Sequence, residues 1–382
     1  MDRRVVERRT FLSSLAVIGA AALVGCSRGG GDGPAPGPTA AGTASSPTTP
    51  SPSPVPSAPP TAGTPTVAGT VATGLNVPWG IAFLSTGDAL VSQRDEGTIV
   101  RIATDGAVTE LGAVPGSVGR PGGEGGLLGL AVAPGDDGTV FAYVTTSTDD
   151  RVVRMSLRGD RLGSPDEILT GIPVGSRHHG GRLLFDASGS LFVSTGDAGD
   201  GRLAQDRDSL AGKVLRIDTD GAAHPDNPFD NRTWSYGHRN IEGLALDADG
   251  RLWAAEFGDK SADELNLIRR GGNYGWPGVE GTGGGGDLVD PLVTWAPDDA
   301  SPAGIAITGS TAFIGALQGE CLFAVPLDGE TAGEPVAHLA GEHGRIRSVA
   351  LAPDGALWVT TSNTDGRGDP SSGDDRILRV TV

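Results

Sequence analysis

The side chains that could do chemistry gather in short Gly-rich segments that lie directly before apolar stretches. One such segment, Ser176–Arg182, carries two adjacent histidines, His178 and His179. An imidazole titrates near neutral pH and can therefore take a proton from a bound hydroxyl group. A histidine pair in a Gly-rich loop is, however, more often part of the loop's own hydrogen bonding. The residues alone leave both interpretations open.

A second segment, Gly344–Arg347, places two arginines two positions apart before an apolar stretch. Residues at that spacing on a strand project to one face, so Arg345 and Arg347 form a paired cationic surface. Two guanidinium groups on one face suit a ligand that bears carboxylates. The alternative is a sheet face whose arginines pair with nearby Asp or Glu side chains, and this acidic chain supplies many of them.

A third segment, Gly237–Gly243, contains Arg239, Asn240 and Glu242. These side chains either converge on a ligand or serve turn and capping hydrogen bonds. A fourth segment, Gly122–Gly129, has the glycine content of a phosphate-binding loop. A dinucleotide fingerprint needs a strand before it and a helix after it. Alternating β residues follow instead, so the sequence argues against that function.

The segments belong to a sequence pattern that is repeated six times: a Gly or Ser, an apolar strand, an Asp/Gly turn and a second apolar strand. The copies start roughly 45–60 residues apart, which is the spacing of one four-stranded propeller blade. A blade cannot bury both faces alone, so blades stack and close radially around a channel. We therefore predict an all-β fold, a six-bladed β-propeller with four-stranded blades. The copies run over Gly80–Arg94, Gly129–Thr146, Gly181–Asp197, Gly243–Asp259, Gly304–Leu317 and Ser348–Asn363.

The composition limits the partners that such a domain can have. The net charge is −18, and only two lysines, Lys213 and Lys260, are present. A field of that sign repels phosphate backbones and anionic membrane surfaces, which argues against nucleic-acid binding. The repeats place one propeller domain over residues 67–382. We expect the strand residue Cys321 to be a buried apolar filler.

The N-terminal residues read as an address for export. Glu7–Leu12 resembles a twin-arginine signal, and the apolar run Leu15–Val24 is too short to span a bilayer. Leu23–Cys26 resembles a bacterial lipobox, so we expect residues 1–26 to be a signal and Cys26 to be lipidated. The Gly/Pro/Ser/Thr-rich residues 27–66 are expected to form a disordered tether. The expected location is the outer face of the cell membrane, with membrane contact through the lipid only.

Longer motifs resemble one known family. Gly237–Asn240 (GHRN), Asp263–Asn266 (DELN) and Gly271–Pro277 (GGNYGWP), with the spacing of the last two, are similar to the soluble pyrroloquinoline-quinone-dependent aldose sugar dehydrogenases, the glucose/sorbosone dehydrogenase family. The likeness runs along the whole predicted propeller. It implies oxidation of an aldose sugar at its anomeric carbon to a lactone, with hydride transfer to calcium-bound quinone and electrons passed to an external acceptor.

The resemblance also implies a role for each matching residue. It makes His178 the catalytic base, and it places Arg239 and Asn240 against the quinone and the sugar. The remaining roles are cofactor carboxylate binding by Arg345 and Arg347, a substrate contact by Glu124, calcium ligation by the backbone carbonyls of Gly258 and Asp259, and positions around a second, structural calcium at Glu264 and Tyr274.

The sequence departs from the family pattern at three positions. Gln318 stands where well-known members carry a lysine that contacts the quinone, and Glu242 replaces a glutamine near the substrate. Arg177 replaces an acidic residue just before the base. Loss of one cation beside an anionic cofactor weakens binding by about 1–3 kcal/mol, the scale of a charged hydrogen bond.

Two other functions remain compatible with the residues. A calcium-dependent sugar lactonase has the same blade count, but it gives no reason for the pair Arg345 and Arg347. A non-catalytic propeller that binds carbohydrate or protein, after losing the quinone, is favoured by Gln318 and Glu242. The identity of the sugar, the electron acceptor and the oligomeric state are not encoded in any motif.

Overall fold

The computed structural model describes residues 63–382. The predicted signal, the lipidation site Cys26 and the predicted tether up to residue 62 lie outside these residues. The described part contains strands β1–β26 and a single four-residue helix, α1 (Arg202–Gln205). None of its helices is long and apolar enough to cross a bilayer.

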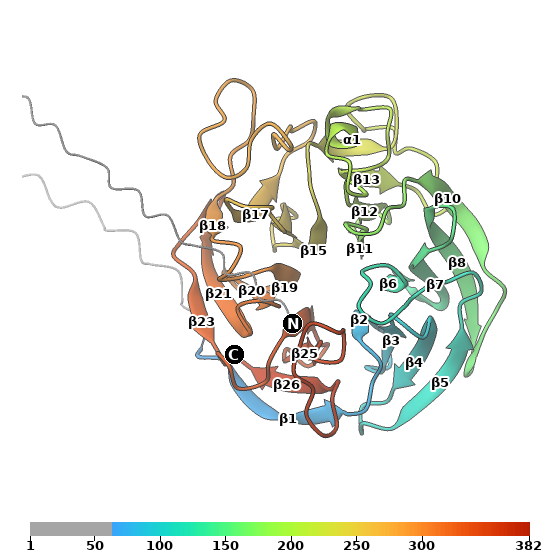
Figure 1. Ribbon diagram of the computed structural model, residues 1–382. Helices are drawn as coiled ribbons and strands as arrows, with labels where there is room; N and C mark the ends of the chain where they lie inside the picture. The colour runs from blue at the N-terminus through green and yellow to red at the C-terminus, as the bar shows by residue number, and fades with distance from the viewer. Residues whose placement is uncertain (1–62) are drawn as a thin grey trace, which may run out of the picture. The chain divides into compact units, whose positions relative to one another are not determined.

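Six antiparallel sheets surround a central axis, and their innermost strands face one another across it (Figure 1). This arrangement confirms the predicted six-bladed β-propeller. The first blade comprises β2 (Pro78–Phe83), β3 (Ala89–Gln93), β4 (Thr98–Ile102) and β5 (Val108–Ala113). The second comprises β6 (Leu127–Ala133), β7 (Asp136–Thr145), β8 (Asp150–Arg158) and β10 (Asp166–Ile172), with β9 (Arg161–Leu162) beside β8. The third comprises β11 (Gly180–Phe185), β12 (Leu191–Thr195), β13 (Lys213–Ile217) and β14 (Thr233–Tyr236).

The remaining blades repeat the pattern, and the last one closes the ring. Its outermost strand is β1 (Thr66–Ala72), which pairs with β26 from Thr66 opposite Thr381 to Ala72 opposite Ile377. The fourth blade comprises β15 (Ile241–Leu246), β16 (Leu252–Glu256), β17 (Asp263–Ile268) and β18 (Val293–Trp295). The fifth comprises β19 (Pro302–Thr308), β20 (Thr311–Ala316), β21 (Cys321–Asp328) and β23 (Val336–His338), with β22 (Thr331–Ala332) beside β21. The sixth comprises β24 (Ile346–Leu351), β25 (Leu357–Thr361), β26 (Ile377–Thr381) and β1.

The Gly or Ser that opens each repeat lies where neighbouring inner strands approach most closely. A Cβ atom on Gly80 would lie 2.7 Å from the backbone of Leu128, and one on Gly129 would lie 2.2 Å from the carbonyl oxygen of Gly181. In the sixth blade, the hydroxyl of Ser348 donates to the carbonyl oxygen of Trp79. The repeated small residue is therefore required by the radial packing of the blades.

The apolar core lies between successive blades. One cluster joins Trp253 of β16 to Ile314 of β20, and it includes Cys321, which is buried as predicted. Another joins Phe141 of β7 to Val193 of β12. Stacking blade against blade thus buries the apolar face that a single sheet leaves open.

The two faces of the ring carry different connections. Each first strand begins, and each second strand ends, on one face, while the tight hairpins between them lie on the other. The strand β26 starts after the long loop 362–376 and ends on the hairpin face, where Gly63 lies against Val382. Both ends of the described chain therefore lie on the hairpin face.

Candidate active site

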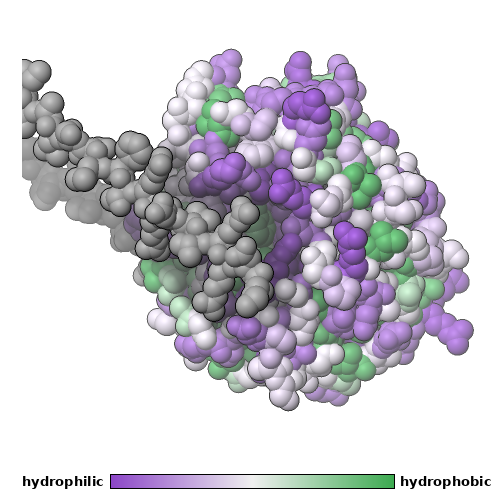
Figure 2. Space-filling view, in the orientation of Figure 1, coloured by the Kyte–Doolittle hydropathy of each residue, from purple (hydrophilic) through white to green (hydrophobic). Residues whose placement is uncertain are grey.

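A cavity of about 360 Å³ opens on the face opposite the hairpins, and all six blades contribute to it. Hydrophilic residues border the hollow at the centre of the ring in Figure 2. Its lining contains six arginines and four carboxylates, and three of these arginines pair with the buried carboxylates of Asp95 and Asp365 just behind the lining. The lining residues are Arg94, Glu124, Arg177, His178, Arg239, Asn240, Glu242, Phe257, Gly258, Asp259, Asp263, Pro297, Ser301, Leu317, Gln318, Arg345, Arg347 and Arg367.

His178 is held by Asp197, a residue that sequence reasoning did not assign. The Nδ1 atom of His178 lies 2.7 Å from Oδ1 of Asp197. Burial raises the pKa of Asp197, but the hydrogen bond and charge of His178 and the bonds from Gly199 and Trp276 outweigh it, so the net pKa is lowered. An ionised carboxylate only accepts, so Nδ1 of His178 carries a proton, and the tautomer of the neutral imidazole that fits this contact has its lone pair on Nε2.

The backbone around His178 is equally constrained. His178 has a φ of 61°, in the left-handed region, and its N–H donates to Oε2 of Glu124 at 2.8 Å. Two residues further along the chain, the N–H of Gly180 donates to Oδ1 of Asn240 at 2.9 Å. The neighbouring His179 instead bonds Asp150 at 2.9 Å and lines a different cavity. Of the two adjacent histidines, only His178 lines the large cavity.

Arg345 and Arg347 converge on one carboxylate, that of Asp365, from which their nearest nitrogens lie 3.2 Å and 3.3 Å away. Arg347 also donates to Glu242 at 2.6 Å. Burial raises the pKa of Asp365, but the charges of the two arginines outweigh it, and the net pKa is lowered. Arg345 and Arg347 therefore lie on one face, as predicted, and they also pair with carboxylates, as the alternative predicted.

Arg239 and the segment after β16 form another part of the lining. Arg239 donates to Asp259 at 3.1 Å and to the carbonyl of Phe257 at 3.4 Å, and its guanidinium lies 5.4 Å from the ring centre of Trp276. Asp263 accepts from the N–H of Gly258 at 2.8 Å. Burial raises the pKa of Asp263 to about 6 despite such bonds. Gly258 and Asp259 both line the cavity.

The three departures from the family pattern also face the cavity. Gln318 and Arg177 line it, and Glu242 makes the ion pair with Arg347. Glu124 is bound by Arg367 at 2.9 Å, which connects it to the loop after β25. The cavity thus brings together every residue predicted to contact the quinone, the sugar or the first calcium.

Glu264 and Tyr274 lie outside the cavity, in the interior of the fourth blade. Glu264 accepts from Asn266 at 2.9 Å and from the N–H of Gly281 at 2.8 Å. Burial, followed by the charge of Glu256, raises the pKa of Glu264 to about 7. The Tyr274 hydroxyl donates to the Leu267 carbonyl at 2.6 Å. Residues 63–382 hold no side-chain cluster of three or more His, Cys, Asp or Glu suited to a metal, and the second calcium stays a prediction.

Two lining arginines carry buried donors that have no protein partner. The Nη2 atom of Arg94 and the Nε atom of Arg239 are both buried and unbonded. Arg94, like Asp197 and Arg367, was not predicted as a site residue. A buried guanidinium donor without an acceptor is costly, and these two donors are available to a ligand that carries acceptor atoms.

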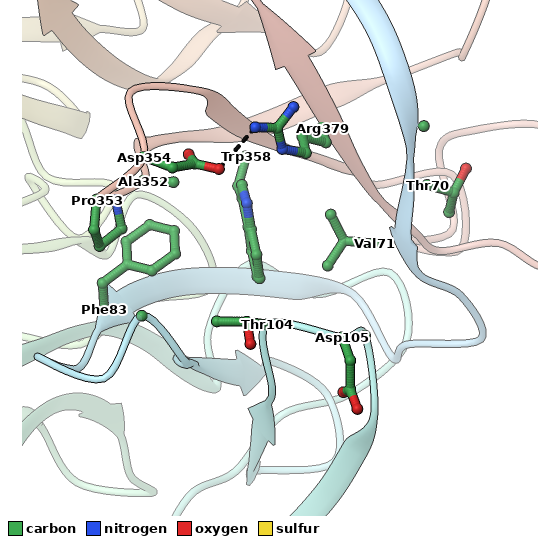
Figure 3. Close-up of a pocket in the computed structure, with 13 residues that line it drawn as sticks. Thr70, Val71, Phe83, Thr104, Asp105, Ala352, Pro353, Asp354, Trp358 and Arg379 are labelled. Atoms are coloured by element: carbon green, nitrogen blue, oxygen red, sulfur yellow. Dashed lines mark hydrogen bonds and ion pairs between the residues drawn. The ribbon is translucent and has the colours of Figure 1, made fainter.

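A second cavity, of about 280 Å³, lies on the hairpin face between the first and last blades (Figure 3). It is lined by Phe83 and Trp358 and rimmed by the ion pair between Asp354 and Arg379 at 2.7 Å. It contains none of the residues predicted to do chemistry. The convergent polar groups are in the first cavity, which we take as the active site.

The fold and this cavity define a β-propeller protein with a histidine–aspartate pair and a pair of buried arginines at one mouth. Residues 75–378 match the family model described as Glucose / Sorbosone dehydrogenase. The chain therefore belongs to the glucose/sorbosone dehydrogenase family and is a sugar dehydrogenase, an oxidoreductase.

Solved and curated relatives agree with this assignment. The chain is 50% identical to an aldose sugar dehydrogenase of Streptomyces coelicolor solved in its PQQ-bound form, over 85% of this chain and 99% of that one, with a TM-score of 0.82. It is 31% identical to an aldose sugar dehydrogenase of Escherichia coli, over 76% of this chain and 89% of that protein. It is also 31% identical to quinoprotein glucose dehydrogenase B of Acinetobacter calcoaceticus, over 55% and 52%.

Proposed function

We propose that this protein oxidises aldose sugars at the anomeric carbon to lactones, with pyrroloquinoline quinone and calcium as cofactors and an external electron acceptor. The observation that carries the proposal is the convergence of three features in one cavity. These are the pair of His178 and Asp197, the paired guanidinium groups of Arg345 and Arg347, and the loop that contains Gly258 and Asp259.

The residues present fit the quinone, which is a planar molecule with three carboxylates. A cavity of about 360 Å³ is within the usual range for small-molecule sites, and its arginines exceed its carboxylates. Arg345 and Arg347 would hold carboxylates of the quinone, with Asn240 and Gln318 beside them. Backbone carbonyls such as those of Gly258 and Asp259 are the hard oxygen ligands that calcium prefers.

When bound, the calcium-associated quinone supplies the acceptor for the hydride, which no protein side chain can replace. The chain's own part is to move a proton and to stabilise charge. His178 Nε2 accepts the proton of the anomeric hydroxyl, and Asp197 stabilises the imidazolium that forms. Arg239 offers a positive charge to the oxygen that becomes electron-rich. Glu124 and Glu242 accept hydrogen bonds from sugar hydroxyls.

The test is reconstitution of the apo-protein with quinone and calcium, followed by dye reduction with a panel of aldoses and by calorimetry of quinone binding. R345A and R347A are expected to weaken quinone binding at least about tenfold, because each removes a charged hydrogen bond. R269A is the matched control, because Arg269 pairs with Glu330 on the exposed surface.

Two results would contradict the proposal. The first is that saturating quinone neither binds nor supports dye reduction with any sugar. The second is hydrolysis of sugar lactones that persists in R347A, which would identify a calcium-dependent lactonase.

A further inference from the structure

Glu280 makes an unusually concentrated set of hydrogen bonds behind the active-site loop. A single oxygen, Oε1, accepts from the backbone N–H groups of four consecutive residues. They are Asp259, Lys260 at 2.9 Å, Ser261 at 3.0 Å and Ala262 at 3.3 Å. Burial raises the pKa of Glu280, but these four bonds outweigh it, so the net pKa is lowered and the carboxylate is ionised near neutral pH.

Peptide geometry then determines where the carbonyls of this loop point. The N–H and C=O of a trans peptide lie in one plane and point in opposite directions. The cis peptides among residues 63–382 are at 276–277 and 374–375, so residues 258–262 are joined by trans bonds. Because the N–H groups of Asp259 and Lys260 point at Glu280, the carbonyls of Gly258 and Asp259 point away from it.

The lining of the cavity distinguishes this loop from Glu280. Gly258 and Asp259 line the cavity, and Glu280 does not. Space behind the loop is tight, since a Cβ on Gly258 would lie 2.6 Å from Oε1 of Glu280 and 1.9 Å from the carbonyl oxygen of Ala262. The loop therefore cannot turn its carbonyls back without breaking the four bonds.

We propose that Glu280 is a positioning residue that turns the carbonyls of Gly258 and Asp259 toward the cavity and thereby sets the affinity for calcium. The inference deepens the proposed function and rests on it. Partners that orient metal ligands from behind typically change metal affinity about 10–100-fold when they are removed. Glu280 does not line the cavity, so its removal is expected to act through the loop.

The experiment compares E280A, E280Q and D290A in the full protein. Calcium binding is measured by calorimetry, and amide hydrogen exchange is followed over residues 257–263. E280A is expected to lose exchange protection in that segment and to weaken calcium binding at least about tenfold. E280Q keeps an acceptor oxygen for the same N–H groups and is expected to restore protection and most of the affinity.

D290A is the matched control. Asp290 accepts from the N–H of Gly283 at 3.0 Å in the same long loop and does not line the cavity, so its removal is expected to leave calcium affinity unchanged. Equal calcium affinity in E280A and the wild type, or equal losses in E280A and D290A, overturns the inference. Failure of the wild-type protein to bind either calcium or quinone overturns the proposed function instead.

Discussion

Two neighbouring histidines show how a single residue's setting decides its use. His178 and His179 are each bonded through Nδ1 to a buried aspartate, Asp197 or Asp150. The difference is the cavity beside them, because only His178 lines the one that also contains the paired arginines. Position relative to the cavity, and not the histidine–aspartate pair itself, is therefore the reason that we propose His178 as the base.

Replacing either member of the first pair is expected to slow the chemical step. H178A removes the proton acceptor, and D197N removes the charge that fixes the tautomer. Both are expected to lower kcat about 10²–10⁴-fold with calcium and quinone binding retained. Steady-state kinetics on the reconstituted enzyme measure this. H179Q is the matched control, and an equal loss of kcat in H179Q contradicts the assignment.

Asp365 gives a prediction about acid stability. Its pKa in the folded protein is lowered from an ordinary value near 3.8, so its contribution to stability is complete above about pH 4. It is lost as pH falls through the lower folded pKa. D365N is expected to reduce the free energy of unfolding by about 3 kcal/mol at pH 7, because it leaves two buried arginines without their shared carboxylate.

Denaturant unfolding at several pH values measures this difference, which should shrink below about pH 4. D354N, at an exposed Asp–Arg pair, is expected to cost less than about 1 kcal/mol and serves as the control. A D365N deficit that is constant down to pH 2 would count against this origin of the stability.

At the residue scale, sequence reasoning found the site residues that lie in a recognisable motif and missed the carboxylates that pair with them. His178, Arg239 and Arg347 lie in recognisable segments, and the structure places all three in the cavity. Asp197 and Asp365 are partners across loops of unrestricted length, so no spacing rule links them to His178 or Arg347. One signal was available, because both follow the end of a blade's second strand within four residues.

At the scale of the element, the inner strands show what the repeated small residue does. Gly129 of β6 lies against the backbone of β11, and there is no room for a Cβ. The repeat predicted the blades and their order because period-two alternation and hairpin turns are local signals. The outermost strand of the sixth blade is harder to predict, since Thr66 of β1 and its partner Thr381 of β26 are 315 residues apart.

G129A is expected to destabilise the propeller by at least about 2 kcal/mol, because the two inner strands must separate to admit the methyl group. Thermal and denaturant unfolding measure the loss. G69A is the control, since a Cβ at that β1 position meets no atom within 4 Å and its φ is not in the left-handed region. Similar stability of both variants would show that the close approach is not required.

At the scale of the whole molecule, charge is distributed unevenly. The chain carries a net charge of −18, yet arginines outnumber carboxylates around the cavity. An acidic exterior repels polyanions, while the arginines that line the cavity offer donors to a small carboxylate-bearing ligand. Composition alone predicted the first property and could not reveal the second, because Arg94 and Arg367 reach the cavity only through folding.

The lipid anchor at Cys26 is a proposal that rests on the sequence. In a bacterial host that lipidates exported proteins, the full chain is expected to incorporate a fatty-acid label and to partition into detergent. C26S should lose both properties and keep its sugar-oxidising activity. C321S is the control. Cys321 is buried in the propeller, so this substitution is expected to leave the labelling unchanged. Labelling that survives in C26S argues against this site.

The position of Val382 on the hairpin face has a practical consequence for any device that immobilises this protein through that residue. A layer of molecules attached in this way would turn the active-site cavity of each molecule toward the solution. Strands of five to seven residues separate the two faces by about 20 Å, a long distance for an electron to travel directly. Electrical contact through Val382 therefore calls for a diffusible mediator that reaches the open side.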